Sequence, residues 1–181
     1  KVNRDIVGSI NIHGPLAVGV SGEDGGLITA AARNPELGFV GDVDSVDPTL
    51  LTKLFAEGLI PVMSTIGTDA SGQAYNINAD TVAGAVAEAI GAEKVVYLTD
   101  VDGLYEDLDN KDSLIGRINV DELQAKLASG QITDGMIPKI EACIHAVSNG
   151  VTSAHLLDGR IPHVALLEIF TDAGIGTMIT D

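Results

Sequence analysis

The chain has 181 residues, of which 45% are hydrophobic, and this composition is typical of a folded globular protein with a substantial core. A formal net charge of −16 and an aromatic content of only 3% argue against nucleic acid or an anionic membrane as the main partner. No apolar run reaches the roughly 18 residues of a membrane-spanning helix, and the first residues do not resemble a signal peptide, so we expect a cytoplasmic protein. The single cysteine, Cys143, excludes an internal disulfide, and its place in an apolar helical stripe predicts that it is buried.

The first half of the chain alternates apolar runs with turn residues. Helices are predicted over residues 3–13 and 48–57, and the second begins at Asp47-Pro48, a typical helix N-terminus. Strands are predicted at residues 16–20, 27–32, 39–43 and 59–64, with a turn at Gly25-Gly26.

The second half continues this alternation, with helices predicted over residues 78–90 and 136–149 and strands over 94–99 and 151–157. The strands are continuous apolar runs, a pattern that indicates burial on both faces of a mostly parallel sheet. We therefore predict an α/β fold, a three-layer αβα sandwich with a mostly parallel sheet, as a single domain over residues 1–181.

Three short polar side chains open the predicted helix 78–90. Asn76 and Asn78 are two residues apart in an extended stretch, so they point to the same side, and Asn78 can cap the helix. Asp80 falls in the first turn, where an acid complements the helix dipole. Asp80 is therefore either a simple dipole partner or a carboxylate that orients a functional lysine.

Lys139 stands in the first turn of the predicted helix 136–149, one residue after Pro138. A cation at this end opposes the helix dipole, at a cost of about 0.3–1 kcal/mol. A bound phosphate would remove the conflict, because backbone N–H groups, the dipole and the ammonium would all face one anion. The alternative is an exposed lysine that points into solvent.

The segment from Thr99 to Tyr105 follows the apolar strand 94–99. In parallel sheets, ligands bind beyond the carboxyl ends of the strands, so this loop is placed to hold a ligand through its backbone and the carboxylates of Asp100 and Asp102. A plain turn built on Asp and Gly103 is the alternative.

Several longer strings resemble the C-terminal two-thirds of the acetylglutamate kinases, which belong to the amino acid kinase family. They are YNINAD, VVYLTDVDGLYED, ITDGMIPKIEA, SAHLLDG and HVALLEIFTDAGIGTMI, in this order and spacing. The resemblance implies the carbamate kinase-like fold and transfer of the γ-phosphoryl group of ATP to the side-chain carboxylate of N-acetyl-L-glutamate, a step of arginine biosynthesis. It also implies a homo-oligomer in the complete protein.

The resemblance also implies roles for individual residues. Lys139 would stabilise charge on the transferred phosphoryl group, Asp80 would orient the catalytic lysines, and Asn76 and Asn78 would hold acetylglutamate. Mg²⁺ would be held mainly by the ATP phosphates, so no protein residue is expected as a direct metal ligand. The residues expected around ATP are Thr99, Asp100, Val101, Asp102, Gly103, Leu104, Tyr105, Gln131, Ile132, Thr133 and Met136.

The C-terminal strings are similar to those of the arginine-inhibited members of the family. By that similarity His155, Glu168 and Gly174 would form an effector site, with Glu168 paired to arginine as the inhibitor. The alternative is a helix at the edge of the core, over residues 163–170, that carries an incidental acid.

Two features of the family pattern are missing from the chain: an N-terminal lysine in a glycine-containing segment and a histidine- and glycine-rich loop. We therefore expect a truncated form in which most of the N-terminal acetylglutamate-binding lobe is missing and which binds nucleotide weakly and turns over negligibly by itself. The alternatives are a non-catalytic nucleotide- or arginine-binding module of the same fold, or another carboxylate or carbamate kinase of the family.

Overall fold

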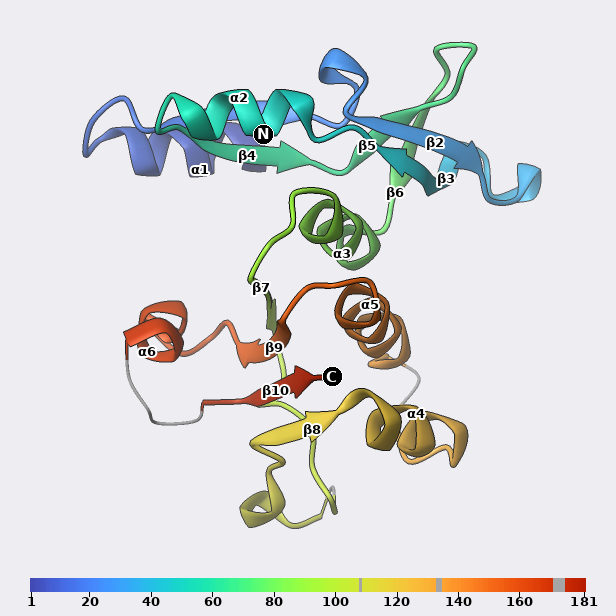
Figure 1. Cartoon of the computed structure of the whole chain (residues 1–181), viewed down its shortest axis with the longest axis vertical. Coiled ribbons are helices and arrows are strands. Elements are labelled where there is room, and N and C mark those ends of the chain that lie inside the picture. The colour runs from blue at the N-terminus through green and yellow to red at the C-terminus, as the bar shows by residue number, and fades with distance from the viewer. Residues whose placement is uncertain (108, 133–134, 171–174) are drawn as a thin grey trace. The chain divides into compact units, whose positions relative to one another are not determined.

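The structure is a computed structural model that describes residues 1–107, 109–132, 135–170 and 175–181 (Figure 1). The chain divides into two compact units, Lys1–Ile90 and Gly91–Asp181. Within the described ranges, none of the helices combines the length and the apolar character needed to cross a membrane.

The first unit begins with helix α1 (Val2–Asn11), which packs on two parallel strands, β1 (Ala17–Ser21) and β4 (Ile60–Ser64). Asn11 fixes the turn out of the helix, because its Oδ1 accepts hydrogen bonds from the backbone N–H groups of Leu16 and Ala17 at 3.0 and 2.6 Å. Helix α2 (Thr49–Ala56) packs on β4, and Asp47 Oδ1 accepts from Thr49 N at 2.9 Å, as the Asp-Pro signal predicts.

Four further strands of the first unit close on themselves in the order β2-β3-β6-β5. Strand β2 pairs antiparallel with β3 and β5 with β6, whereas β2–β5 and β3–β6 are parallel. Leu27, Ile28 and Ile77 are buried in the core of this unit. The bounds are β2 Ile28–Ala32, β3 Val40–Val46, β5 Ile66–Thr68 and β6 Ala74–Ile77, with short 3-10 helices η1 (Asp24–Gly26) and η2 (Pro35–Leu37) in the connections.

Helix α3 (Ala79–Ala89) follows β6 and packs on β3. The predicted cap is confirmed, because Asn78 Oδ1 accepts from the backbone N–H groups of Asp80 at 2.8 Å and Thr81 at 3.2 Å. Val82 is buried as its spacing predicts, and the small residues Gly84 and Ala87 are buried beside it.

The second unit contains a four-stranded sheet in the order β7-β9-β10-β8. Strands β7 and β9 are parallel, β10 is antiparallel to β9, and β8 is parallel to β10. The bounds are β7 Lys94–Thr99, β8 Arg117–Asn119, β9 Ser153–Asp158 and β10 Thr177–Thr180, with the 3-10 helix η3 at Lys111–Ser113.

Helices flank β9 on two sides. Figure 1 shows α5 (Ile137–Ser148) and α6 (Val164–Phe170) on opposite sides of this strand, while α4 (Val120–Ala128) packs on α5 and β8. Every residue of β9 is buried, as predicted for a strand covered on both faces, and Cys143 on α5 is fully buried too. The predicted α/β class is therefore confirmed.

The structure differs from the sequence predictions at several elements. Strand β7, one of the two edge strands of its sheet, is not buried throughout: Val95, Tyr97 and Thr99 on one face are buried, but Leu98 on the other face is exposed. Strands β5, β8 and β10 and helix α4 were not predicted, and of β6 only the extended stretch at Asn76 was. Helix α4 carried a recognisable signal, the capping box of Asn119 and Glu122.

The cap of α3 can be tested by comparing two substitutions at one position. Replacing Asn78 with Ala removes the acceptor for two backbone N–H groups and should lower the free energy of unfolding by about 1 kcal/mol, whereas Asn78→Ser should retain most of the stability. Urea denaturation of both variants measures the difference. Equal stability of the Ala and Ser variants would contradict the capping role.

Candidate functional site

The carboxyl ends of β7 and β9 lie next to each other. The two strands are parallel neighbours in a register that places Thr99 opposite Asp158, and Gly159 N donates a hydrogen bond of 2.8 Å to Thr99 O. The loops that leave the two strands are therefore adjacent. One of them is the predicted ligand loop, residues 99–105, and the other is the turn at Asp158-Gly159-Arg160.

The ligand loop 99–105 has a defined internal structure. Thr99 Oγ1 accepts from Val101 N at 3.1 Å and donates to Val101 O at 2.8 Å, which closes the first part of the loop. Leu104 N donates to Thr177 Oγ1 of β10 at 2.8 Å. Gly103 has φ +146°, and a Cβ there would lie 2.6 Å from Thr177 Oγ1, so glycine is required at this position.

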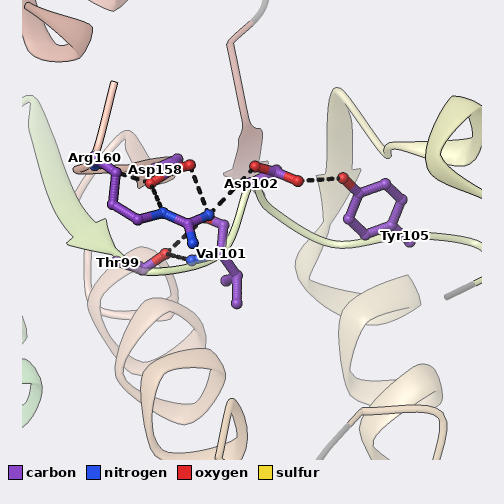
Figure 2. Close-up of polar contacts among 6 residues, drawn as sticks. All are labelled: Thr99, Val101, Asp102, Tyr105, Asp158 and Arg160. Atoms are coloured by element: carbon purple, nitrogen blue, oxygen red, sulfur yellow. Dashed lines mark hydrogen bonds and ion pairs between the residues drawn. The ribbon is translucent and has the colours of Figure 1, made fainter. Parts of the chain in front are cut away.

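Asp158 and Arg160 form a bidentate ion pair at the end of β9 (Figure 2). Arg160 Nε donates to Asp158 Oδ1 at 2.8 Å and Nη2 to Oδ2 at 2.9 Å, while the backbone N–H of Arg160 also donates to Oδ1 at 2.9 Å. These hydrogen bonds lower the pKa of Asp158 to about 2, and the carboxylate in turn raises the pKa of Arg160. Both groups are thus charged across the physiological pH range.

Asp102 lies between Arg160 and Tyr105, as Figure 2 shows. Arg160 Nη2 is 3.7 Å from Asp102 Oδ1, and the Tyr105 hydroxyl donates to Asp102 Oδ2 at 2.7 Å. The hydrogen bond to Asp102 raises the pKa of Tyr105, and partial desolvation and the carboxylate charge add to the shift. The two loops are therefore joined by a chain of polar contacts that ends at Tyr105.

Sequence reasoning placed Thr99, Asp102 and Tyr105 at this edge but missed Asp158 and Arg160. A signal for Asp158 existed, since it stands at the end of a buried strand and is followed by glycine, just as Asp102 in the loop after β7 is followed by Gly103. The first partner of Arg160, Asp158, is local, but its contact with Asp102 could not be predicted, because Asp102 lies far away in the sequence and is brought near by the pairing of β7 with β9.

The predicted acetylglutamate and catalytic residues are divided between the two units. Asn76 is exposed near the end of β6, Asn78 caps α3, and Asp80 is half-buried in the first turn of α3. Lys139 is half-buried in the first turn of α5, where it was predicted. Asp80 belongs to the first unit and Lys139 to the second, so their pairing stays a prediction.

The remaining nucleotide residues lie at the approach to α5. Gln131 is exposed, Ile132 is half-buried, and Met136 is the N-cap residue of α5. Their contact with nucleotide stays a prediction. The predicted residues Thr133 and Gly174 lie outside the described residues.

His155 and Glu168, two of the predicted effector residues, are brought together. His155 Nδ1 is 2.7 Å from Glu168 Oε1, with 2% of the His155 side chain exposed and 14% of that of Glu168. Burial lowers the pKa of His155, and the charge of Lys94 acts in the same direction, whereas the Glu168 carboxylate opposes them. The uncharged imidazole therefore donates from Nδ1 to Glu168 and accepts at Nε2 from the Ser153 hydroxyl, 2.9 Å away.

In the part of the chain that the structure describes, no group of three or more His, Cys, Asp and Glu side chains is arranged to hold a metal ion. The carboxylates of Asp102 and Asp158 instead contact Arg160.

Comparison with known proteins identifies the class. Residues 1–158 match the amino acid kinase family, and the chain belongs to this family. The solved N-acetylglutamate synthase from Neisseria gonorrhoeae, in complex with coenzyme A and L-arginine, has the same fold over 91% of this chain and 38% of its own, with a TM-score of 0.77 and 26% identity. The predicted amino acid kinase fold is therefore confirmed.

Closer sequence relatives are acetylglutamate kinases. That of Saccharopolyspora erythraea is 53% identical over 186 residues, which cover 99% of this chain and 61% of that protein. That of Nostoc punctiforme is 50% identical over 180 residues, which cover 99% of this chain and 60% of that protein. The chain thus spans about three fifths of the length of these kinases.

The depressed pKa of Asp158 predicts a pH-dependent contribution to stability. A carboxylate with a folded-state pKa of about 2, below its ordinary 3.8, stabilises the folded state above pH 3.8 and loses that effect as the pH falls towards 2. Asp158→Asn should therefore unfold at lower urea than the wild type at pH 7, and the gap should narrow below pH 4. Asp121→Asn, at an exposed position of α4, is the control. A gap of the same size at pH 7 and pH 2.5 would refute the assignment.

Proposed function

We propose that the complete natural protein is an acetylglutamate kinase, which transfers the γ-phosphoryl group of ATP to the side-chain carboxylate of N-acetyl-L-glutamate in arginine biosynthesis. The observation that carries this proposal is the 53% identity to an acetylglutamate kinase across 99% of the chain. The site at the ends of β7 and β9 adds support, because parallel strands of an α/β sheet present ligand-binding loops at this edge.

In the proposed reaction, a carboxylate oxygen of acetylglutamate attacks the γ-phosphorus of ATP. A new P–O bond forms as the bond to the ADP oxygen breaks, and ADP leaves with the electron pair, giving an acyl phosphate and no covalent enzyme intermediate. Catalysis then rests on positioning and on neutralising the negative charge of the phosphoryl group. Mg²⁺ bound to the ATP phosphates would neutralise part of that negative charge, with few or no direct protein ligands.

Lys139 is proposed to neutralise the transferred phosphoryl group. It lies in the first turn of α5, where the helix dipole also favours an anion, so the backbone and the ammonium would act on the same phosphate. Asp80, in the first turn of α3, is proposed to orient the catalytic lysines, and Asn76 and Asn78 to hold acetylglutamate. The nucleotide is proposed to lie against the loop 99–105 and residues 131–133 and 136.

The effector proposal concerns His155 and Glu168. His155 Nδ1 contacts Oε1 of Glu168, and the second carboxylate oxygen, Oε2, is proposed to accept hydrogen bonds from the guanidinium or amino group of L-arginine. That a synthase of the same fold was solved with L-arginine supports arginine as a ligand of this fold. Arginine would then inhibit the kinase by coupling between two sites.

Lys139 can be tested by its effect on turnover. Lys139→Ala in the complete protein should lower kcat by about 10²–10³, because a charge that stabilises the transition state is lost. Lys53→Ala, which removes an exposed lysine in the last turn of α2, should have little effect. ADP release measures turnover, and an unchanged kcat in the Lys139 variant would leave that residue without its proposed role.

The acceptor can be identified in the same ADP-release assay. Acetylglutamate, aspartate, glutamate and carbamate are compared as acceptors with the wild-type protein. Acetylglutamate should give the highest kcat/KM. Preference for another carboxylate or for carbamate would favour a different kinase of the family, and no turnover with any of them would favour a non-catalytic binding module.

Arginine inhibition can be tested by titration of L-arginine with acetylglutamate as the varied substrate. The KM for acetylglutamate should rise at saturating arginine, and Glu168→Gln should weaken arginine binding at least about tenfold, since a charge-assisted pair is lost. Glu141→Gln, at an exposed position of α5, is the control. An acetylglutamate KM that does not respond to arginine would rule out the effector site.

A further inference from the structure

Arg160 makes a bidentate ion pair although most of its side chain faces solvent. The side chain is 63% exposed, and pairing at such a position usually contributes little because ordering a long side chain offsets the attraction. Its partner Asp158 differs from an ordinary surface carboxylate, because the side chain is only 7% exposed. A carboxylate so little exposed to water requires hydrogen-bond donors from the protein. The bidentate geometry of the pair, closed by the backbone N–H of Arg160, fixes the guanidinium at the end of β9.

The fixed guanidinium also faces a second carboxylate, on the neighbouring loop. Asp102 Oδ1 lies 3.7 Å from Arg160 Nη2, which is too long for a hydrogen bond but within the range of an ion pair. The charge of Asp100 acts on Arg160 as well. Arg160 is therefore the cation towards which the carboxylates at the ends of two parallel strands converge.

This convergence holds the middle of the ligand loop 99–105. The loop is fixed near its two ends by hydrogen bonds from the backbone to threonine hydroxyls: Val101 N donates to Thr99 Oγ1, and Leu104 N donates to Thr177 Oγ1. Its middle is held through the side chain of Asp102, which Arg160 attracts from one side and the Tyr105 hydroxyl binds from the other (Figure 2).

We propose that Arg160 is a positioning residue for the nucleotide: anchored on Asp158, it draws Asp102 towards β9 and so holds the loop 99–105 in its binding conformation. This inference rests on the proposed function of that loop. Arg160 also offsets the negative charge of Asp158, Asp102 and Asp100 at a place where an anionic nucleotide would bind. Its loss would therefore loosen the loop and increase the repulsion between these carboxylates and the nucleotide.

Steady-state kinetics and hydrogen exchange of the complete protein test this role. Arg160→Ala should raise the KM for ATP about tenfold, with little change in kcat or in the KM for acetylglutamate. In the ligand-free protein, the amides of residues 101–105 should exchange about tenfold faster. Arg117→Ala removes an exposed arginine of β8 and should change neither quantity. An Arg160 variant with the wild-type KM for ATP and wild-type exchange would overturn the inference.

A double-mutant cycle separates positioning from direct contact with nucleotide. If Arg160 acts through Asp102, then Asp102→Ala combined with Arg160→Ala should raise the KM for ATP no further than either change alone. Multiplicative effects would overturn the inference and indicate direct contact. If Arg160→Ala does not fold, Tyr105→Phe, which removes the other contact to Asp102, should raise the KM for ATP about threefold, and no rise would overturn the inference.

The outcomes also distinguish this inference from the proposed function. If the wild-type protein neither binds nor consumes ATP, the proposed function fails, and exchange of the amides of 101–105 in the ligand-free Arg160 variant still decides whether Arg160 holds the loop. If the wild-type protein consumes ATP and the Arg160 variant matches it, the inference alone fails.

Discussion

The candidate site depends on the parallel pairing of β7 with β9. Because the register places Thr99 opposite Asp158, the two loops that follow these strands leave the sheet side by side, and Gly159 N bonds directly to Thr99 O. The contact between Arg160 and Asp102, which joins the two loops, depends on this arrangement. A shift of one residue along β9 would turn Asp158 and His155 each to the other face of the sheet, which would separate Arg160 from Asp102 and His155 from Glu168.

A strongly acidic chain that is proposed to bind ATP needs cations at defined places. With a net charge of −16, the protein as a whole repels an anionic ligand, so cationic groups at the site have to compensate for this repulsion. Lys139 is backed by the N-terminus of α5, whereas Arg160 is anchored on a nearly buried carboxylate. Lys139 is therefore suited to neutralising a phosphate, whereas Arg160 is suited to holding the conformation of the loop 99–105.

The parts of the fold that could be predicted are those with local signals. The cap at Asn78, the proline in the first turn of α5 and the apolar run of β9 lie within a few neighbouring residues, and all three are present in the structure. Strands β5, β6, β8 and β10 have only three or four residues each, and partners distant in sequence define them. The candidate site shows the same division between local and distant signals. The loop 99–105 could be predicted because it follows an apolar strand. The contact of Arg160 with Asp102 could not be predicted, because it depends on the register of the sheet, which no short stretch of sequence specifies.

Binding of nucleotide at the carboxyl ends of β7 and β9 can be measured directly by hydrogen exchange of the complete protein, with and without a non-hydrolysable Mg²⁺–ATP analogue at saturating concentration. Nucleotide bound at this edge should slow the exchange of the amides of residues 99–105 and leave the exchange of α1 unchanged. Saturated binding that leaves the exchange of 99–105 unchanged would show that nucleotide binds elsewhere.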